Sequence, residues 1–403
     1  MEKPNKVEEE RANNKMKSSA FNFDSNKQDE IQEKEAIKIL CFDGLIDPSW
    51  VEYLNMINDE TKTQCLVNGD IIKLNNYKIV FETDNLNYCT PSFITKNYVV
   101  HFDLETLTWE NMLFDFIANN KKVYINNDLK NYIRGLYENY FPKIYEFIMS
   151  SKSIAFNFKE NYVLKNLLLL FDSILPEYDF SDKKLGRRNL DRVSRIDIIK
   201  KSTLSIFIFS CAWTIMFFTN FILKSKVEKL ISDIFKIDDL RGPIFDYFIN
   251  DETHKFESWE EKIENELMPE TRKKQEEVRN TYNGQFLYNK VFVPTLDSVS
   301  YQYILKKFIK AGHPIFYTGK VGVGKTYLIN DLLNEMDENR DEVFVLRYLI
   351  NYNSSPKKLE NYILDNLKYV KRDLIGDLYN RRVVFFVDDC NLQKADKYNS
   401  QSC

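Results

Sequence analysis

The sequence predicts an α/β fold in which two partial α/β subdomains flank a mostly helical region. Apolar runs that end in acidic residues occur near both ends of the chain, at 37–43 and 382–389. Between them, residues 104–240 repeat apolar residues at helical spacing with few helix breakers. A glycine-rich loop at 319–326 separates a short apolar run from a helix-forming run. The low counts of 11 Gly and 10 Pro favour long helices over an all-β sandwich full of tight turns.

Length and composition narrow the class of protein. A chain of 403 residues suggests two or three domains. Its 56 basic and 60 acidic residues give a formal net charge of −4, which argues against a dedicated nucleic-acid binder. A hydrophobic content of 44% excludes a wholly disordered chain. The six cysteines form no C-x-x-C pair and there are only three histidines, so we expect free thiols and no zinc site.

The first domain boundary is marked by a change in composition. Residues 1–36 are charged and polar with no apolar stretch, which predicts a disordered leader rather than a secretory signal. Residues 37–42 predict a buried strand that ends at Asp43-Gly44, and 45–57 predict a loop and a helix. The further short strands that we expect in this part are 64–67, 71–74, 77–81 and 98–102.

The helical region contains one segment with two possible interpretations. Residues 203–223 carry no charge for about 20 residues, the length of a membrane span. A helix buried on all sides in a large domain has the same composition, and the Ser, Thr and Asn residues of the segment weaken the membrane interpretation. Pro142 and Pro176 predict helix ends in this region.

A new domain is predicted after a charged stretch. Residues 250–285 suit a solvated helix or linker, and Val291–Thr295 restarts the apolar pattern. A helix is expected at 297–310, with Gly312 as its stop, followed by a strand at Ile315–Thr318.

The loop after that strand matches a phosphate-binding pattern. Gly319, Lys320, Val321, Gly322, Val323, Gly324, Lys325 and Thr326 fit G-x-x-x-x-G-K-[ST] at every fixed position. Glycines let backbone N–H groups approach phosphate oxygens, and a helix that starts near Lys325 points its positive dipole end at the same phosphates. Lys325 is expected to contact the β- and γ-phosphates, and the Thr326 hydroxyl to hold Mg²⁺.

A second element supports this interpretation. Residues 382–387 predict a buried strand that ends in Asp388 and Asp389, about 60 residues after the loop, which is the Walker B layout. Asp388 would hold the Mg²⁺ shell, and Asp389 occupies the position of the catalytic carboxylate that activates water. Glu is usual there, so the shorter Asp389 makes nucleotide binding better supported than hydrolysis. The alternative is a structural glycine turn and an unrelated strand ending in exposed acids.

The chain resembles a dynein heavy chain, a microtubule motor built on a ring of six AAA+ modules. The stretches that carry the resemblance are 39–44, 47–55, 65–72, 81–86, 207–213, 293–299 and 386–391. The resemblance covers about 37–395 and implies the end of a second module and the start of a third. The sequence Phe386-Val387-Asp388-Asp389-Cys390-Asn391 resembles axonemal members of the family.

The resemblance implies roles for particular residues. Asp43 would be the Mg²⁺-side acid of the second site, and because Gly44 follows it, that site should bind nucleotide without hydrolysing it. Asn85 falls near the polar sensor position of the family. Lys96 stands where the family has the arginine finger, and lysine keeps the charge but loses the planar fork. Residues 207–213 resemble a buried lid helix, which disfavours the membrane span.

The resemblance also implies a domain plan and a context. The expected parts are a leader at 1–36, the end of the second large subdomain at 37–104, a helical lid at 105–240, a charged linker at 241–290 and the start of the third module at 291–403. The cofactors would be ATP and Mg²⁺. The partners would be the remaining modules of the ring, dynein intermediate and light chains, and microtubules through other regions, with no nucleic acid and no membrane. The location would be the cytoplasm and cytoskeleton, with a cilium or flagellum axoneme as a further possibility.

Two other hypotheses stay open on the sequence alone. One is a short stand-alone P-loop ATPase or nucleotide-binding regulatory protein. The other is a single-span membrane protein with a nucleotide-binding tail, which depends on residues 203–223 alone.

Overall fold

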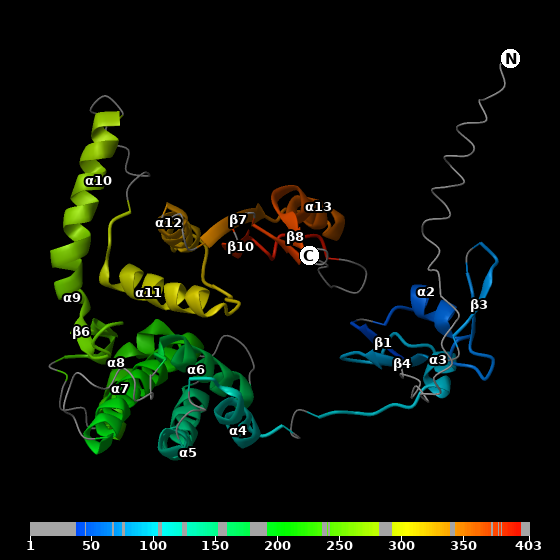
Figure 1. Cartoon of the computed structure of the whole chain (residues 1–403), viewed down its shortest axis with the longest axis horizontal. Helices are drawn as coiled ribbons and strands as arrows, with labels where there is room; N and C mark the ends of the chain where they lie inside the picture. Colours follow the sequence, from blue (N-terminus) through cyan, green and yellow to red (C-terminus); the bar gives the residue numbers. More distant parts are fainter. Residues whose placement is uncertain are drawn as a thin grey trace, which may run out of the picture. The chain divides into compact units, whose positions relative to one another are not determined.

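The computed structural model of the chain contains two units, one up to Phe102 and one from Asp103 (Figure 1). The residues that the structure describes are 38–44, 46–66, 68–74, 77–103, 107–122, 127–151, 159–177, 192–235, 240, 242–281, 292–338, 343–371, 374–377, 379 and 381–395. The predicted leader at 1–36 lies outside them.

The first unit has a small parallel sheet at its centre. Strands β1 (Lys38–Asp43) and β4 (Tyr77–Glu82) pair in parallel, with Asp43 opposite Glu82. Strands β2 (Thr63–Cys65) and β3 (Ile71–Lys73) form an antiparallel hairpin. The remaining elements are α2 (Pro48–Val51), a 3₁₀ turn η1 (Glu52–Leu54) and α3 (Pro91–Lys96). Its core is small and consists of Ile46, Val51 and Phe93 with Trp50, Phe81 and Cys89 around them.

Two predictions for this unit need correction. The first strand forms but is not buried, because Ile39 is 66% exposed and no other described strand pairs with the β1–β4 sheet. Residues 98–102 do not form a strand, since no described strand is hydrogen-bonded to them, and Tyr98 is fully exposed.

The second unit begins with the predicted helical region. Its helices are α4 (Trp109–Asn119), α5 (Asn127–Ser150), α6 (Glu160–Ile174), α7 (Arg192–Phe218) and α8 (Lys224–Phe235), with a short 3₁₀ turn η4 (Phe221–Leu223) before α8. Apolar faces of all five helices meet in one large core. Pro176 follows the end of α6, as predicted, but Pro142 lies inside α5. Buried Phe141 and Ile144 on either side of Pro142 hold α5 against the core and offset the missing backbone hydrogen bond.

Helix α7 explains the ambiguous apolar segment. Residues Ile196–Phe218 are long and apolar enough to cross a membrane, yet 67% of the most apolar window is buried inside the protein. Phe207, Phe209 and Ile215 are completely buried among the neighbouring helices. This burial is the pattern of a core helix and favours the second interpretation of the segment.

A hairpin and a long charged helix follow. Strands β5 (Tyr247–Ile249) and β6 (Phe256–Ser258) pair after the 3₁₀ turn η5 (Ile244–Asp246). The chain continues through α9 (Trp259–Lys262), a π-helical turn (Ile263–Leu267) and α10 (Met268–Thr281). Trp259 is buried at the start of this helix and stacks on Phe248, with ring centroids 4.4 Å apart.

The last part of the second unit is a partial α/β subdomain. Its elements are α11 (Leu296–Ala311), α12 (Lys325–Glu338), β7 (Val343–Leu349), α13 (Pro356–Asn366), β8 (Lys368–Lys371), β9 (Leu374–Gly376) and β10 (Arg382–Asp388). Strands β7 and β10 pair in parallel along their whole length, and β8 and β9 form a hairpin. The predicted strand at Ile315–Thr318 is wrong, because those residues are hydrogen-bonded to no described strand.

Helix α11 joins the helical region to this α/β subdomain (Figure 1). It packs on α6 and on α12. Thr295 and Ser298 form a capping box at its start, and Gly312 ends it in the left-handed conformation at φ 79°, as predicted. On the helical-region side, Trp213 contacts the ring of Tyr301 with centroids 5.5 Å apart.

Candidate nucleotide site

The glycine-rich loop leads directly into a helix, as the sequence predicts. Helix α12 begins at Lys325, and Gly322 and Gly324 have φ angles of 82° and 85°. These left-handed conformations favour glycine. A Cβ on Gly319 would meet the Lys325 side chain at 3.3 Å, so a larger residue there would crowd that lysine. The loop thus brings backbone N–H groups and the positive end of α12 to one exposed place.

The Lys325 side chain folds back over the loop. Its ammonium donates to the carbonyl oxygens of Gly319 at 2.9 Å and Lys320 at 2.8 Å. Neither partner is a carboxylate, so within these contacts the positive charge has no counter-charge. An ammonium held by two neutral carbonyls is suited to an anion that arrives from outside.

The two predicted magnesium ligands of the α/β subdomain, Thr326 and Asp388, lie together. The Thr326 hydroxyl lies 3.3 Å from Asp388 Oδ1, although 62 residues separate them. Thr326 stands on the first turn of α12, and Asp388 ends β10 at the carboxyl edge of the parallel pair. A hydroxyl and a carboxylate oxygen are ligands that Mg²⁺ accepts. In the part of the chain that the structure describes, no cluster of three or more His, Cys, Asp or Glu residues could hold a metal.

The predicted catalytic residue has an unusual backbone. Asp389 has a φ of 55°, its amide donates to Asp388 Oδ1 at 3.0 Å, and its carbonyl accepts from the Leu392 amide. Its side chain is exposed, and a left-handed aspartate marks the turn where the strand ends. The carboxylate therefore starts from a tight turn beside Asp388 and not from a strand extension.

The contacts that hold α12, the helix after the loop, in place were not predicted from the sequence. Gln302 on α11 donates to the Asp331 carboxylate of α12 at 3.0 Å, and Lys306 pairs with Glu335 at 2.8 Å. Phe292 also faces the ring of Tyr327, with centroids 5.8 Å apart. The opposite charges of Lys306 and Glu335 were a usable signal for the α11–α12 pair, but nothing in the sequence indicated the aromatic pair.

The third predicted metal residue, Asp43, belongs to the first unit, which ends at Phe102. Asp43 ends β1 with an exposed side chain, and the amide of Gly44 donates to the Glu82 carbonyl at 3.0 Å. The metal-binding role of Asp43 stays a prediction. Lys96 of the same unit forms an ion pair with Asp59 at 2.9 Å and donates to the Asn55 carbonyl at 3.4 Å, so its ammonium is engaged within its own unit.

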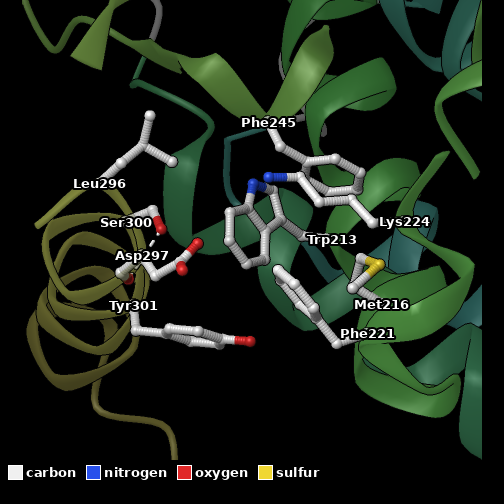
Figure 2. Close-up of a pocket in the computed structure, with 9 residues that line it drawn as sticks. All are labelled: Trp213, Met216, Phe221, Lys224, Phe245, Leu296, Asp297, Ser300 and Tyr301. Atoms are coloured by element: carbon white, nitrogen blue, oxygen red, sulfur yellow. Dashed lines mark hydrogen bonds between the residues drawn. The ribbon is translucent and has the colours of Figure 1, made fainter. Parts of the chain in front are cut away.

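A pocket lies between the helical region and α11, and the residues that line it include none of the glycine-rich loop (Figure 2). The Lys224 ammonium stands 5.6 Å from the rings of both Phe221 and Phe245. Trp213 contacts Phe245 and Tyr301 edge to face. These contacts pack the helical region onto α11, and they include none of the predicted site residues.

Two family models match the chain. The model described as dynein heavy chain AAA lid domain matches residues 133–261, and the model described as P-loop containing dynein motor region matches residues 280–403. Together the two matches cover more than half of the chain. The chain belongs to the dynein heavy chain family.

Curated relatives agree with this assignment. Dynein heavy chain-like protein 2 from Plasmodium falciparum is 28% identical over 90% of this chain and 6% of its own length. Dynein axonemal heavy chain 17 from mouse is 24% identical over 91% of this chain and 8% of its own length. Human dynein axonemal heavy chain 6 is 24% identical over 90% of this chain. The chain thus spans less than a tenth of these dynein heavy chains, and the matches favour a section of a motor ring over a stand-alone P-loop protein.

Proposed function

We propose that this section of a dynein heavy chain binds ATP with Mg²⁺ at residues 319–326. The observation that carries the proposal is the set of contacts at the start of α12, where the Lys325 ammonium is held over the loop by two carbonyls. Lys325 would bind the terminal phosphates, and Thr326 and Asp388 would hold the metal, which supplies charge neutralisation on the phosphate oxygens.

Hydrolysis by this section alone is expected to be slow. Asp389 is one methylene shorter than the glutamate that usually activates water, and its backbone is fixed in a left-handed turn. An arginine finger supplied by a neighbouring module contributes roughly 10³–10⁵ to the rate in related enzymes. We therefore assign Asp389 a catalytic role only within a complete ring.

The remaining assignments follow from family membership. Residues 37–104 would end the second large subdomain, 105–240 would form its lid, 241–290 a linker, and 291–403 would begin the third module. Asp43 would contribute to Mg²⁺ binding at the second site. The section would contribute to ATP-driven movement along microtubules, with intermediate and light chains as partners of the whole motor. The names of the axonemal relatives support a cilium or flagellum axoneme as the location.

Replacement of Lys325 by alanine tests the site. Loss of a charge-assisted hydrogen bond predicts that Lys325→Ala weakens binding of a fluorescent ATP analogue by about 10- to 100-fold. Lys357→Ala is a matched control, because Lys357 is an exposed lysine of α13 that lies outside the loop. Equal affinity of the Lys325→Ala variant and the unmodified chain would contradict the proposed site.

A second measurement separates the ring section from a stand-alone enzyme. The purified 403-residue chain is expected to bind ATP with little turnover. Robust phosphate release, at a rate typical of a complete ATPase, would instead support an independent enzyme.

A further inference from the structure

The start of β10 is bonded to the end of α11. Nη1 of Arg382 donates to the Ile309 carbonyl at 3.2 Å and also to the Lys310 carbonyl. Arg382 is the first residue of β10, and Lys310 is the residue before the last in α11. The contact joins segments more than 70 residues apart in the sequence.

The helix end is a favourable place for this guanidinium. The last carbonyls of a helix lack partners within it and carry the negative end of the helix dipole. The amides of Gly312 and His313 already satisfy Ile309 and Phe308, each at 3.0 Å. Arg382 adds a donor for the Lys310 carbonyl, and its positive charge interacts favourably with the negative end of the helix dipole.

The far end of the same strand carries the proposed metal ligand. Strand β10 has seven residues, so Asp388 lies about 20 Å along the strand from Arg382. Its pairing with β7 is unbroken over this length. A fixed position of Arg382 along the strand direction therefore fixes Asp388 as well.

The other metal ligand depends on the same helix. Thr326 lies on α12, and α12 is tied to α11 by the Gln302–Asp331 hydrogen bond and the Lys306–Glu335 ion pair. Helix α11 is thus the common support of both ligands. One is held through α12 and the other through Arg382 and β10, and the two meet at the 3.3 Å contact.

We infer that Arg382 is a positioning residue for the metal end of this site, because it sets the place of Asp388 relative to Thr326. The inference rests on the proposed Mg²⁺·ATP site. Val384 and Phe386 pack against the apolar cluster that α11, α12 and β7 form and hold the middle of the strand, so the guanidinium acts on the position of the strand along its own axis. The contacts of Lys325 with the loop do not involve this strand, so phosphate binding without metal should be independent of Arg382.

The test compares the affinity for a fluorescent ATP analogue in Mg²⁺ and in EDTA. Replacing a residue that orients a metal ligand commonly lowers metal affinity about 10- to 100-fold. Because Arg382 and Asp388 stand at opposite ends of β10, we expect a smaller loss of about three- to tenfold in the affinity for the analogue. Arg382→Ala should lose this factor in Mg²⁺ and keep the affinity of the unmodified chain in EDTA. Arg382→Lys should recover part of it, because lysine keeps the charge without the fork. Arg272→Ala, an exposed arginine of α10, is the control.

The ratio of the two affinities separates positioning from general stability. Equal loss with and without Mg²⁺ would mean that Arg382 only stabilises the fold, and it would overturn the inference. An unchanged ratio with unchanged affinities would overturn it as well. Failure of the unmodified chain to bind the analogue in either buffer would overturn the proposed function itself, and this inference with it.

Discussion

At the scale of residues, the site depends on contacts made by the first two residues of α12. The Lys325 ammonium binds two loop carbonyls, and the Thr326 hydroxyl contacts Asp388. Asp388 and Asp389 are adjacent acids with different predicted roles. In the structure Asp388 ends the strand and Asp389 turns away from it, so only Asp388 meets the first turn of α12.

The prediction at the scale of residues concerns the role of the Thr326 hydroxyl in binding Mg²⁺. Thr326→Val keeps the shape of the side chain and removes the oxygen that would bind Mg²⁺. We expect the gain in ATP affinity on adding Mg²⁺ to fall by about tenfold, while the affinity in EDTA stays the same. Isothermal titration calorimetry in both buffers measures this difference.

Thr326→Ser is the matched control, because serine restores the hydroxyl and loses only a methyl group. It should retain the magnesium effect. A valine variant that responds to Mg²⁺ as the unmodified chain does would exclude Thr326 as a ligand.

At the scale of elements, the end of α11 depends on a glycine. Gly312 has a φ of 79° and open space around it, so alanine would meet no atom but would adopt an unfavourable backbone conformation. Gly312→Ala is expected to lower the free energy of unfolding by about 1–2 kcal/mol. Urea denaturation followed by circular dichroism measures the change.

Gly135 provides a control of opposite sign. It lies inside α5, also with open space where a Cβ would be, and without a positive φ. Gly135→Ala should leave stability unchanged or raise it by up to about 1 kcal/mol, because alanine is the better helix former. Equal effects of the two substitutions would contradict the assigned conformations.

Local patterns predicted part of the elements, while strands β5 to β9 and helices α3 and α13 were not predicted. The errors among the predicted elements have physical causes. Apolar spacing identified the helices between 104 and 240, and the acidic ends identified β1 and β10. Residues 98–102 and 315–318 have strand-forming sequences, but a strand also needs a hydrogen-bonding neighbour, which the described residues do not provide. Pro142 shows the reverse, since burial of its neighbours overrides a local helix breaker.

At the scale of the whole molecule, α11 connects the helical region with the nucleotide site. It packs on α6 and α12, and His313 just after it lies 3.8 Å from Asp172 of α6. Local sequence patterns could not predict these contacts, because they join residues far apart in the chain. The composition of α7 fits a membrane span, but the family resemblance of residues 207–213 already implied a buried helix, and the fold shows that burial.

The central claim is that the loop at 319–326 binds the phosphates of ATP through Lys325. A crystal structure of the chain with Mg²⁺ and a non-hydrolysable ATP analogue tests it most directly. We predict that the Lys325 ammonium leaves the carbonyls of Gly319 and Lys320 for the terminal phosphates, with the metal between Thr326 and Asp388. A structure in which the analogue binds elsewhere, with Lys325 still on both carbonyls, would contradict the account.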